Sequence, residues 1–480
     1  MAESDSNKKI DHNILVKSSV WYTIANFLTR AMVFITTPIF TRLMTKKEYS
    51  DFSVFATWQS ILIIICGLEI YVTLNRVRFD YPDKKEIDSY ITSSLLLSNI
   101  LTAIFLIFYL LFPNILEGAM LMDRRYILLM FAYLFTYPAF GMFQAKQRIE
   151  YKYKLSAGIT FVLLILSTGL GLLLAYNIEA DRLLGRIVGQ YAPFIVAGLA
   201  MYVYFIIRSK KVQLKFWKYA IVMGIPLVLS YLGNQVLLYS DKVVVQHMCT
   251  SDELAWLVLA TTCSHIMLIL VQTLNSAWSP WFFDKLNAGE EGNIRKTFRI
   301  YVFVVMLLTA GAILIGPEIV ALLGGKSYEA SKYVLPAYMT CGVTTAITSQ
   351  YVNIETYYKK TRYAAILTAI VAALNVALDI IGVRLWGYQA ACYATVLCQI
   401  ILIILHAIAT RKLGAGKLIP VRDLLIFIGI TMLMVPLGLL LYQRNMIRYI
   451  FVGVVLAAVI VLIIVKRKTI KEKIKNFKNS

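Results

Sequence analysis

The chain has 480 residues, of which 59% are hydrophobic and 16% are charged, and its mean hydropathy is +0.69. Soluble domains carry roughly 25% charged residues, so this composition excludes an ordinary soluble globular protein. A formal net charge of +21 would suggest nucleic-acid binding in a soluble chain. Here the basic residues gather in every second connection between apolar segments, which argues against that class.

Apolar segments recur along the whole chain, and about fourteen of them are long enough to cross a bilayer as helices. The sequence therefore predicts an all-α polytopic membrane protein. The predicted spans are residues 20–44, 52–74, 90–112, 126–145, 155–176, 183–207, 219–240, 254–275, 300–323, 333–352, 363–383, 387–409, 424–442 and 447–465.

The connections predict the orientation of the chain. One alternating set is strongly basic, as in "NRVRFDYPDKKE", "RSKKVQLKFWK", "YYKKTR" and the tail "KRKTIKEKIKNFK". The other set, such as "NIEADR" and "VRLWG", carries few basic residues. The positive-inside rule places the basic set and both termini in the cytoplasm. The same charges would also attract anionic lipid headgroups.

A faint internal repeat indicates two similar halves. "LGRIVGQYAPFIVAGL" resembles "WGYQAACYATVLCQII", and "KKEYSDFSVFAT" resembles "TSDELAWLVLATT". We therefore expect a six-helix lobe over residues 1–211, a second one over 212–413, and a terminal helix pair with a basic tail over 414–480. Repeats of this kind place a substrate site between the halves, near the bilayer midplane.

Arg30 lies near the middle of the first span, where an ionised side chain costs at least ~2.5–3.5 kcal/mol. Helical spacing places it on one face with Asn26, Thr37 and Thr41. Such a polar stripe is expected of a cavity wall. The alternative is a structural arginine that pairs with a carboxylate or with backbone carbonyls elsewhere in the bundle.

Further polar residues lie in the seventh and sixth spans. Asn234 and Asp241 share a face of the seventh span, and Lys242 follows directly. Asp241 and Lys242 are near a span end, so we expect them to reach water by snorkelling more readily than to form a site. The same applies to Arg186 at the start of the sixth span.

Three more titratable residues are candidates for ion coupling. Asp379 precedes Arg384 by five residues, and a pair between them is the preferred interpretation. His265 lies mid-span, where it could carry protons, although a hydrogen-bonded core histidine is commoner. Glu69 could pair with Arg76 or help to bind a cation, and the sequence does not decide between these.

Signatures of catalysis are missing from the sequence. There is no HExxH, GxSxG or CxxC motif, and the six cysteines indicate neither a disulfide framework nor a zinc site. "LGAGKLIP" fails as a phosphate-binding loop because Arg411 replaces its first glycine and Leu418 its Ser/Thr. We expect no enzyme activity, no cofactor and no metal site.

The N-terminal run "SSVWYTIANFLTRAMVFITTPIFTRLMTKKEYSDFSVFATWQSI" and the helix pair "LNVALDIIGVRLWGYQAACYATV" resemble bacterial polysaccharide flippases of the Wzx type. These belong to the multidrug/oligosaccharidyl-lipid/polysaccharide exporter superfamily. The resemblance implies transfer of undecaprenyl-pyrophosphate-linked oligosaccharides to the outer leaflet of the bacterial inner membrane, by alternating access between two lobes.

The resemblance also implies a cationic cavity between the lobes. The candidate residues for binding the anionic head group are Arg30, Asn26, Thr37, Asn234 and Arg186. An ion gradient, of H⁺ or Na⁺, is expected to drive transport, and the candidates for coupling are Asp241, His265, Asp379 and Glu69. Membrane lipids, a polysaccharide polymerase and chain-length machinery are the expected partners.

Several alternatives stay open. A drug/cation antiporter of the same superfamily would be expected to line its cavity with carboxylates, and a peptidoglycan-precursor flippase would share the fold. A membrane polymerase or acyltransferase usually needs a larger outer loop or a catalytic His/Asp cluster, and neither is present. A scaffold for glycan assembly would not need the polar stripe around Arg30.

Overall fold

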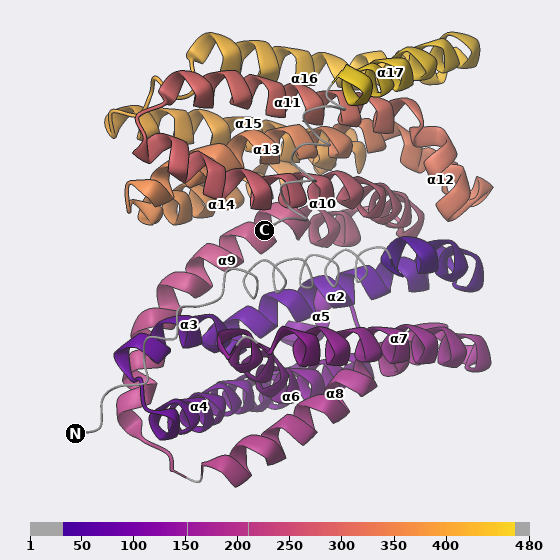
Figure 1. Cartoon of the computed structure of the whole chain (residues 1–480). Helices are drawn as coiled ribbons and strands as arrows, with labels where there is room; N and C mark the ends of the chain where they lie inside the picture. Colours follow the sequence, from indigo (N-terminus) through magenta and orange to yellow (C-terminus); the bar gives the residue numbers. More distant parts are fainter. Residues whose placement is uncertain (1–31, 151, 210, 466–480) are drawn as a thin grey trace.

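The computed structural model describes residues 32–150, 152–209 and 211–465, and these residues form helices and no strand. Figure 1 shows two stacked blocks of roughly parallel helices. The N-terminal block comprises the segment Met32–Leu43, α2 (Lys46–Gly67), α3 (Ile70–Asp80), α4 (Lys84–Leu111), α5 (Pro113–Met120), α6 (Arg124–Ile149), α7 (Tyr153–Asn177), η1 (Glu179–Asp181) and α8 (Arg182–Arg208).

The second block lies above the first in Figure 1, and α9 (Leu214–Met248) runs between them. This C-terminal block comprises α10 (Ser251–Asn287), α11 (Glu291–Leu314), α12 (Gly316–Gly324), η2 (Lys326–Tyr333), α13 (Leu335–Tyr357), α14 (Thr361–Trp386), α15 (Gln389–Lys412), α16 (Val421–Tyr442) and α17 (Asn445–Val465). Successive long helices alternate in direction, so the basic connections share one side of the molecule, here called the basic side.

The multi-pass helical architecture predicted from hydropathy is confirmed. Within the described residues, eleven helices are long and apolar enough to cross a membrane. The other three predicted spans correspond to Met32–Leu43, α13 and α17. α13 is less apolar because it lies inside the C-terminal block, where most of its residues are buried by other helices. Polar side chains on it therefore meet protein partners and not lipid.

The second predicted span, residues 52–74, is not one continuous helix. α2 ends at Gly67, and both Leu68 (φ 48°) and Glu69 (φ 50°) are left-handed before α3 begins. Left-handed backbone is strained for residues other than glycine, so neighbouring structure must hold it. α9 packs closely against this break at Gly224, where a Cβ would lie 2.6 Å from the Leu68 carbonyl oxygen.

The ninth predicted span, residues 300–323, is also divided. α11 ends at Leu314, and a separate short helix, α12, begins at Gly316. Pro317 lies in the first turn of α12, where its missing N–H costs no hydrogen bond. α12 therefore lies beyond the end of α11 on the side opposite to the basic side, at the right of Figure 1.

α9 contacts both blocks. On its basic-side half, Trp217 donates a hydrogen bond to the Ser93 carbonyl (2.8 Å) and Tyr219 to Asp80 (2.7 Å), both in the N-terminal block. Its other half packs on α14 and α15 through an apolar cluster that includes Leu237. The predicted lobe boundary after residue 211 stays a prediction, since the packing of α9 belongs to both sides of it.

Helices α7 and α8 pack with unusually close backbones. A Cβ at Gly185 would lie 2.5 Å from the Leu174 carbonyl oxygen, and one at Gly189 would clash with the Leu170 carbonyl oxygen. The Gly185-x-x-x-Gly189 spacing places both glycines on one face of α8. Small residues at this spacing let membrane helices approach closely, where dispersion forces replace the missing hydrophobic driving force.

We expect Gly189→Val to destabilise the N-terminal block by ~1–3 kcal/mol, because the added methyl groups have no space. Gly169→Val is the matched control, since Gly169 is an exposed glycine of α7 with no atom near its Cβ position. The measurement is the temperature at which each detergent-purified protein stops eluting as a single species. Equal melting of the two variants would contradict the close-packing argument.

Candidate functional site

A cavity of about 240 Å³ lies between the N-terminal block and the helices α9 and α10. Its wall combines two cationic side chains with hydroxyl and aromatic groups, and it includes no Asp or Glu among the described residues. The lining residues are Val33 and Thr37; Tyr49, Phe52, Ser53, Ala56, Thr57 and Ser60 of α2; Arg186 of α8; Gln235, Tyr239 and Lys242 of α9; and Val258, Thr262 and His265 of α10.

Arg186 is buried at the cavity and does not reach bulk water as the sequence had suggested. Its guanidinium carbon lies 3.8 Å from the ring centre of Phe40 and 3.7 Å from that of Phe52. The remaining polar contact is a weak one from Nη1 to the Met44 sulfur (3.6 Å), and Nε is buried without a partner. Cation–π contacts compensate only part of the lost hydration, so this guanidinium retains donors for an anion.

Lys242 is the second buried cation, and it was not among the predicted binding residues. It is 5% exposed, and its ammonium donates to the Ser53 hydroxyl (3.0 Å) and lies over the Tyr239 ring. The expectation that Asp241 and Lys242 snorkel to water is wrong, because both are buried. In the described part of the chain neither Lys242 nor Arg186 forms a side-chain ion pair.

The other predicted binding residues are placed differently. Thr37 lies in the cavity wall and its hydroxyl donates to the Val33 carbonyl (2.6 Å). Asn234 is exposed and does not line the cavity, whereas its neighbour Gln235 does line it. Arg30 and Asn26 lie outside the described residues, so their place in the cavity stays a prediction.

Two buried carboxylates meet behind the cavity wall, inside the C-terminal block. The Ser240 hydroxyl lies 2.9 Å from Asp379 Oδ2 and 2.9 Å from Asn375 Oδ1. The neighbouring Asp241 accepts hydrogen bonds from the backbone N–H of Lys242 (2.8 Å) and from the Tyr338 hydroxyl. The preferred Asp379–Arg384 pair is wrong, because Asp379 is fully buried on neutral partners.

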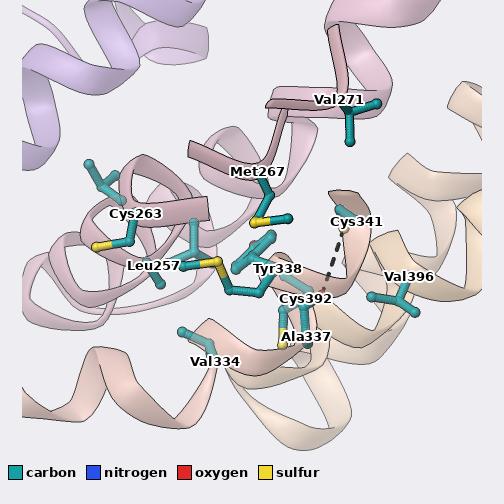
Figure 2. Close-up of a cluster of buried hydrophobic side chains, with 14 of the residues drawn as sticks. Leu257, Cys263, Met267, Val271, Val334, Ala337, Tyr338, Cys341, Cys392 and Val396 are labelled. Carbon is teal, nitrogen blue, oxygen red and sulfur yellow. Dashed lines mark hydrogen bonds between the residues drawn. The ribbon is translucent and has the colours of Figure 1, made fainter. Parts of the chain in front are cut away.

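Tyr338, which contacts Asp241, lies in an apolar cluster. Figure 2 shows Tyr338 of α13 among Leu257 and Met267 of α10 and Cys392 of α15. In the described part of the chain neither carboxylate forms a salt bridge, although Lys242 directly follows Asp241, and a buried carboxylate is stabilised by hydrogen bonds or by a bound cation or proton. The arrangement therefore suits a bound proton or a small cation held by oxygen ligands.

The four candidate residues for ion coupling therefore lie in three separate regions of the structure. Asp241 and Asp379 are together, whereas His265 lines the cavity. Glu69 is buried at the break between α2 and α3. It does not pair with Arg76, which instead contacts Asp80 (3.1 Å).

The two blocks are joined on the side opposite to the basic side. The Thr41 hydroxyl donates to the Leu323 carbonyl of α12 (2.5 Å), and the Lys46 ammonium lies 2.6 Å from Asp252. Both α2 and α10 begin there with the same capping box, formed by Thr45 with Glu48 and by Thr250 with Glu253. These matched termini belong to the sequence segments that resemble each other.

A transition-metal site is not apparent in the described part of the chain. No group of three or more His, Cys, Asp or Glu residues is placed to hold a metal ion there. The six cysteines lie within this part, and all are free thiols.

Comparisons with known proteins agree on family and fold. The sequence profile of the family described as "Polysaccharide biosynthesis protein" matches residues 15–286. An Lsg locus protein of Haemophilus influenzae is 21% identical over 361 residues, which are 72% of this chain and 86% of that protein.

Solved structures are similar in fold at low sequence identity. The lipid II flippase MurJ, in an inward closed conformation, gives a TM-score of 0.66 at 15% identity over 94% of this chain and 100% of its own. An inward-facing multidrug resistance transporter of the MATE family, in the MOP superfamily, gives a TM-score of 0.62 at 16% identity. That match covers 81% of this chain and 95% of the transporter. The chain therefore belongs to the polysaccharide biosynthesis protein family and has the all-helical membrane fold of these flippases and transporters.

Proposed function

We propose that this protein is a flippase that moves undecaprenyl-pyrophosphate-linked oligosaccharide units from the cytoplasmic to the outer leaflet for polysaccharide biosynthesis. The observation that carries the proposal is the inter-block cavity, which holds two cations without ion pairs and no carboxylate. An anionic head group is the ligand that such a wall favours. Membership of the polysaccharide biosynthesis family supports the sugar part of the substrate.

The two cations suit a pyrophosphate in different ways. The planar guanidinium of Arg186 presents several donors in a fork, whereas the Lys242 ammonium acts as a compact point charge. Arg30, two helical turns before Thr37 on the same predicted face, would extend this charge toward the basic side. The hydroxyls of Ser53, Thr57 and Ser60 would meet the sugars, while the lipid tail stays in the bilayer.

A cation antiporter of the same superfamily is the less favoured alternative. Its cavity would need negative charge to stabilise a cationic drug, and the described lining residues offer none. A peptidoglycan-precursor flippase would bind the same pyrophosphate-lipid chemistry, so the cavity charge does not separate it from the main proposal. The two flippases differ in which lipid-linked substrate accumulates in cells that lack the protein.

We expect Arg186→Ala and Lys242→Ala each to lower flipping roughly tenfold to hundredfold, because each removes charge-assisted hydrogen bonds to the head group. Arg186→Lys should retain part of the activity. The measurement is the leaflet distribution of labelled lipid-linked oligosaccharide in cells that lack the native protein, restored with each variant at matched membrane abundance. The control is Arg208→Ala, an exposed arginine at the other end of α8.

Clearance of the oligosaccharide lipid by Arg186→Ala protein at the wild-type rate would remove Arg186 from the transport path. Accumulation of lipid-linked peptidoglycan precursor in place of the oligosaccharide lipid would favour the second flippase. The same cells test Arg30, where Ala is expected to abolish transport and Lys to keep part of it.

We further propose that Asp241 and Asp379 hold the coupling ion, H⁺ or Na⁺. Asp379→Asn should make transport independent of whichever gradient drives the wild type, because an amide carries no charge to exchange. The measurement is oligosaccharide-lipid transport in membrane vesicles with an imposed proton or sodium gradient. Asp423→Asn is the control, because Asp423 is a buried carboxylate of the same block that is paired with Arg299 (2.6 Å).

If the basic side is cytoplasmic, the joined side faces outward and the cavity is closed to the exterior. Loss of the Lys46–Asp252 contact should then weaken that closure. In a Ser53→Cys background, we expect Asp252→Ala to increase labelling by a membrane-impermeant thiol reagent added outside intact cells. Unchanged labelling would show that the ion pair does not hold the outer side closed, and restored protection in a Lys46→Asp, Asp252→Lys double variant would show that it does.

A further inference from the structure

The C-terminal block contains a fully buried Glu–His pair that the transport site described above does not use. His406 Nδ1 of α15 lies 2.7 Å from Glu355 Oε1 of α13, and both side chains have no exposed surface. The outer atoms of the pair, Glu355 Oε2 and His406 Nε2, are buried without hydrogen-bond partners. In the described part of the chain, each of these two side chains has only the other as its polar partner.

The pair lies close to the basic side. The Glu355 carbonyl accepts the Lys360 N–H (2.8 Å) in the turn that ends α13. Tyr338, which contacts Asp241, is 17 residues earlier on the same helix, or about 26 Å at 1.5 Å per residue. The pair is therefore a separate site from the Asp241–Asp379 site.

A row of buried polar side chains lies on α13 between these two sites. Thr344 hydrogen-bonds Gln399 of α15, and Asn353 donates to Asn275 of α10 (3.0 Å). The ring of Tyr351 is parallel to the His406 imidazole, with the ring centres 6.4 Å apart. α13 and α15 are neighbours within the block (Figure 1), so this polar seam lies inside protein and away from lipid.

The chemistry of the pair favours one exchangeable proton. With a neutral imidazole donating from Nδ1 to an ionised carboxylate, the pair carries one negative charge in a dry interior. One added proton makes the pair neutral overall, and His406 Nε2 is the vacant nitrogen that can receive it. The proton comes from water and returns to water, and no electron moves.

We propose that the Glu355–His406 pair is a proton-binding site, loaded from the basic side, whose occupancy makes transport depend on cytoplasmic pH. The proton-binding half of this proposal stands without the flippase, whereas the transport half rests on the proposed function. Apolar side chains of similar volume often replace buried ion pairs without loss of stability, so stability alone does not account for ionisable groups at this place.

Other ionisable groups at this level must be considered in any titration. On the basic-side ends of α10, α11, α13, α14, α15 and α16 these groups include Asp284, Lys285, Glu291, Arg295, Lys296, Arg299, Tyr351, Tyr357, Arg362, Tyr363, Arg411, Lys412, Arg422 and Asp423. Asp423 and Arg299 neutralise each other. None of these groups makes a hydrogen bond or ion pair with the Glu355 or His406 side chain in the described structure.

The test uses the full chain labelled with ¹⁵N-histidine and reconstituted in lipid vesicles, followed by solid-state NMR between about pH 5 and 8, the range in which imidazoles change charge. The chain has four histidines, and a His406→Gln spectrum identifies the His406 signals. If the pair binds and releases a proton, the ¹⁵N signals of His406 in the wild-type protein change across this pH series. In Glu355→Gln this dependence on pH should differ from that of the wild type, because the carboxylate partner of His406 Nδ1 is gone.

Asp423→Asn is the control and should leave the His406 titration unchanged. A wild-type His406 that keeps one protonation state throughout, or one that titrates identically in Glu355→Gln, would overturn the proposal. The wild-type titration decides the matter even if Glu355→Gln protein does not fold. The pair could titrate while loss of the whole protein leaves the leaflet distribution of lipid-linked oligosaccharide unchanged. That result would support the proton site and reject the flippase function.

In the transport assay, His406→Gln should flatten the dependence of oligosaccharide-lipid clearance on internal pH, relative to Asp423→Asn. A wild-type pH profile in His406→Gln protein would reject the transport half of the proposal. Because this readout compares profile shapes and not rates, a uniform loss of activity from misfolding does not imitate the expected result.

Discussion

The proposed transport site depends on keeping carboxylates out of the cavity wall that holds Arg186 and Lys242. Arg186 lies between two aromatic rings at the block boundary, while Asp241 and Asp379 are held by Tyr338 and Ser240 inside the C-terminal block. If a carboxylate reached the cavity, it would neutralise the cations there, and a pyrophosphate would have to displace it. A buried guanidinium with a vacant donor costs free energy that a bound anion recovers.

Local patterns in the sequence were sufficient to predict the helices. Hydropathy and loop charge are properties of contiguous residues, so the spans followed directly from them. The break at Leu68–Glu69 was not predictable, because a lone Gly67 is common in membrane helices. Its cause is tertiary: Gly224, far along the chain, lets α9 approach the Leu68 carbonyl.

The site was predictable in its chemistry but not in its geometry. Polar residues within spans drew attention to Thr37 and Arg186, which line the cavity, and to Asp241 and Asp379, which are buried behind it. Their burial depended on which helices cover the span ends, and proximity to an end gave a false impression of water access for Lys242. The contact between Ser240 and Asp379 joins residues 139 positions apart, and no local pattern encodes that pairing.

α9 links the two kinds of charge through a single turn of helix. Asp241 and Lys242 are consecutive, so their side chains leave the helix axis about 100° apart; one contacts Tyr338 in the C-terminal block and the other lies in the cavity. Gly224 and Pro226 separate this turn from the basic-side half of α9, whose Trp217 and Tyr219 contact the N-terminal block. In the proposed cycle, an ion that changes the hydrogen bonds of Asp241 must also move Lys242, because a rigid helical turn carries both. Ion binding and head-group binding would then be coupled by one element, without a relay of contacts across the block.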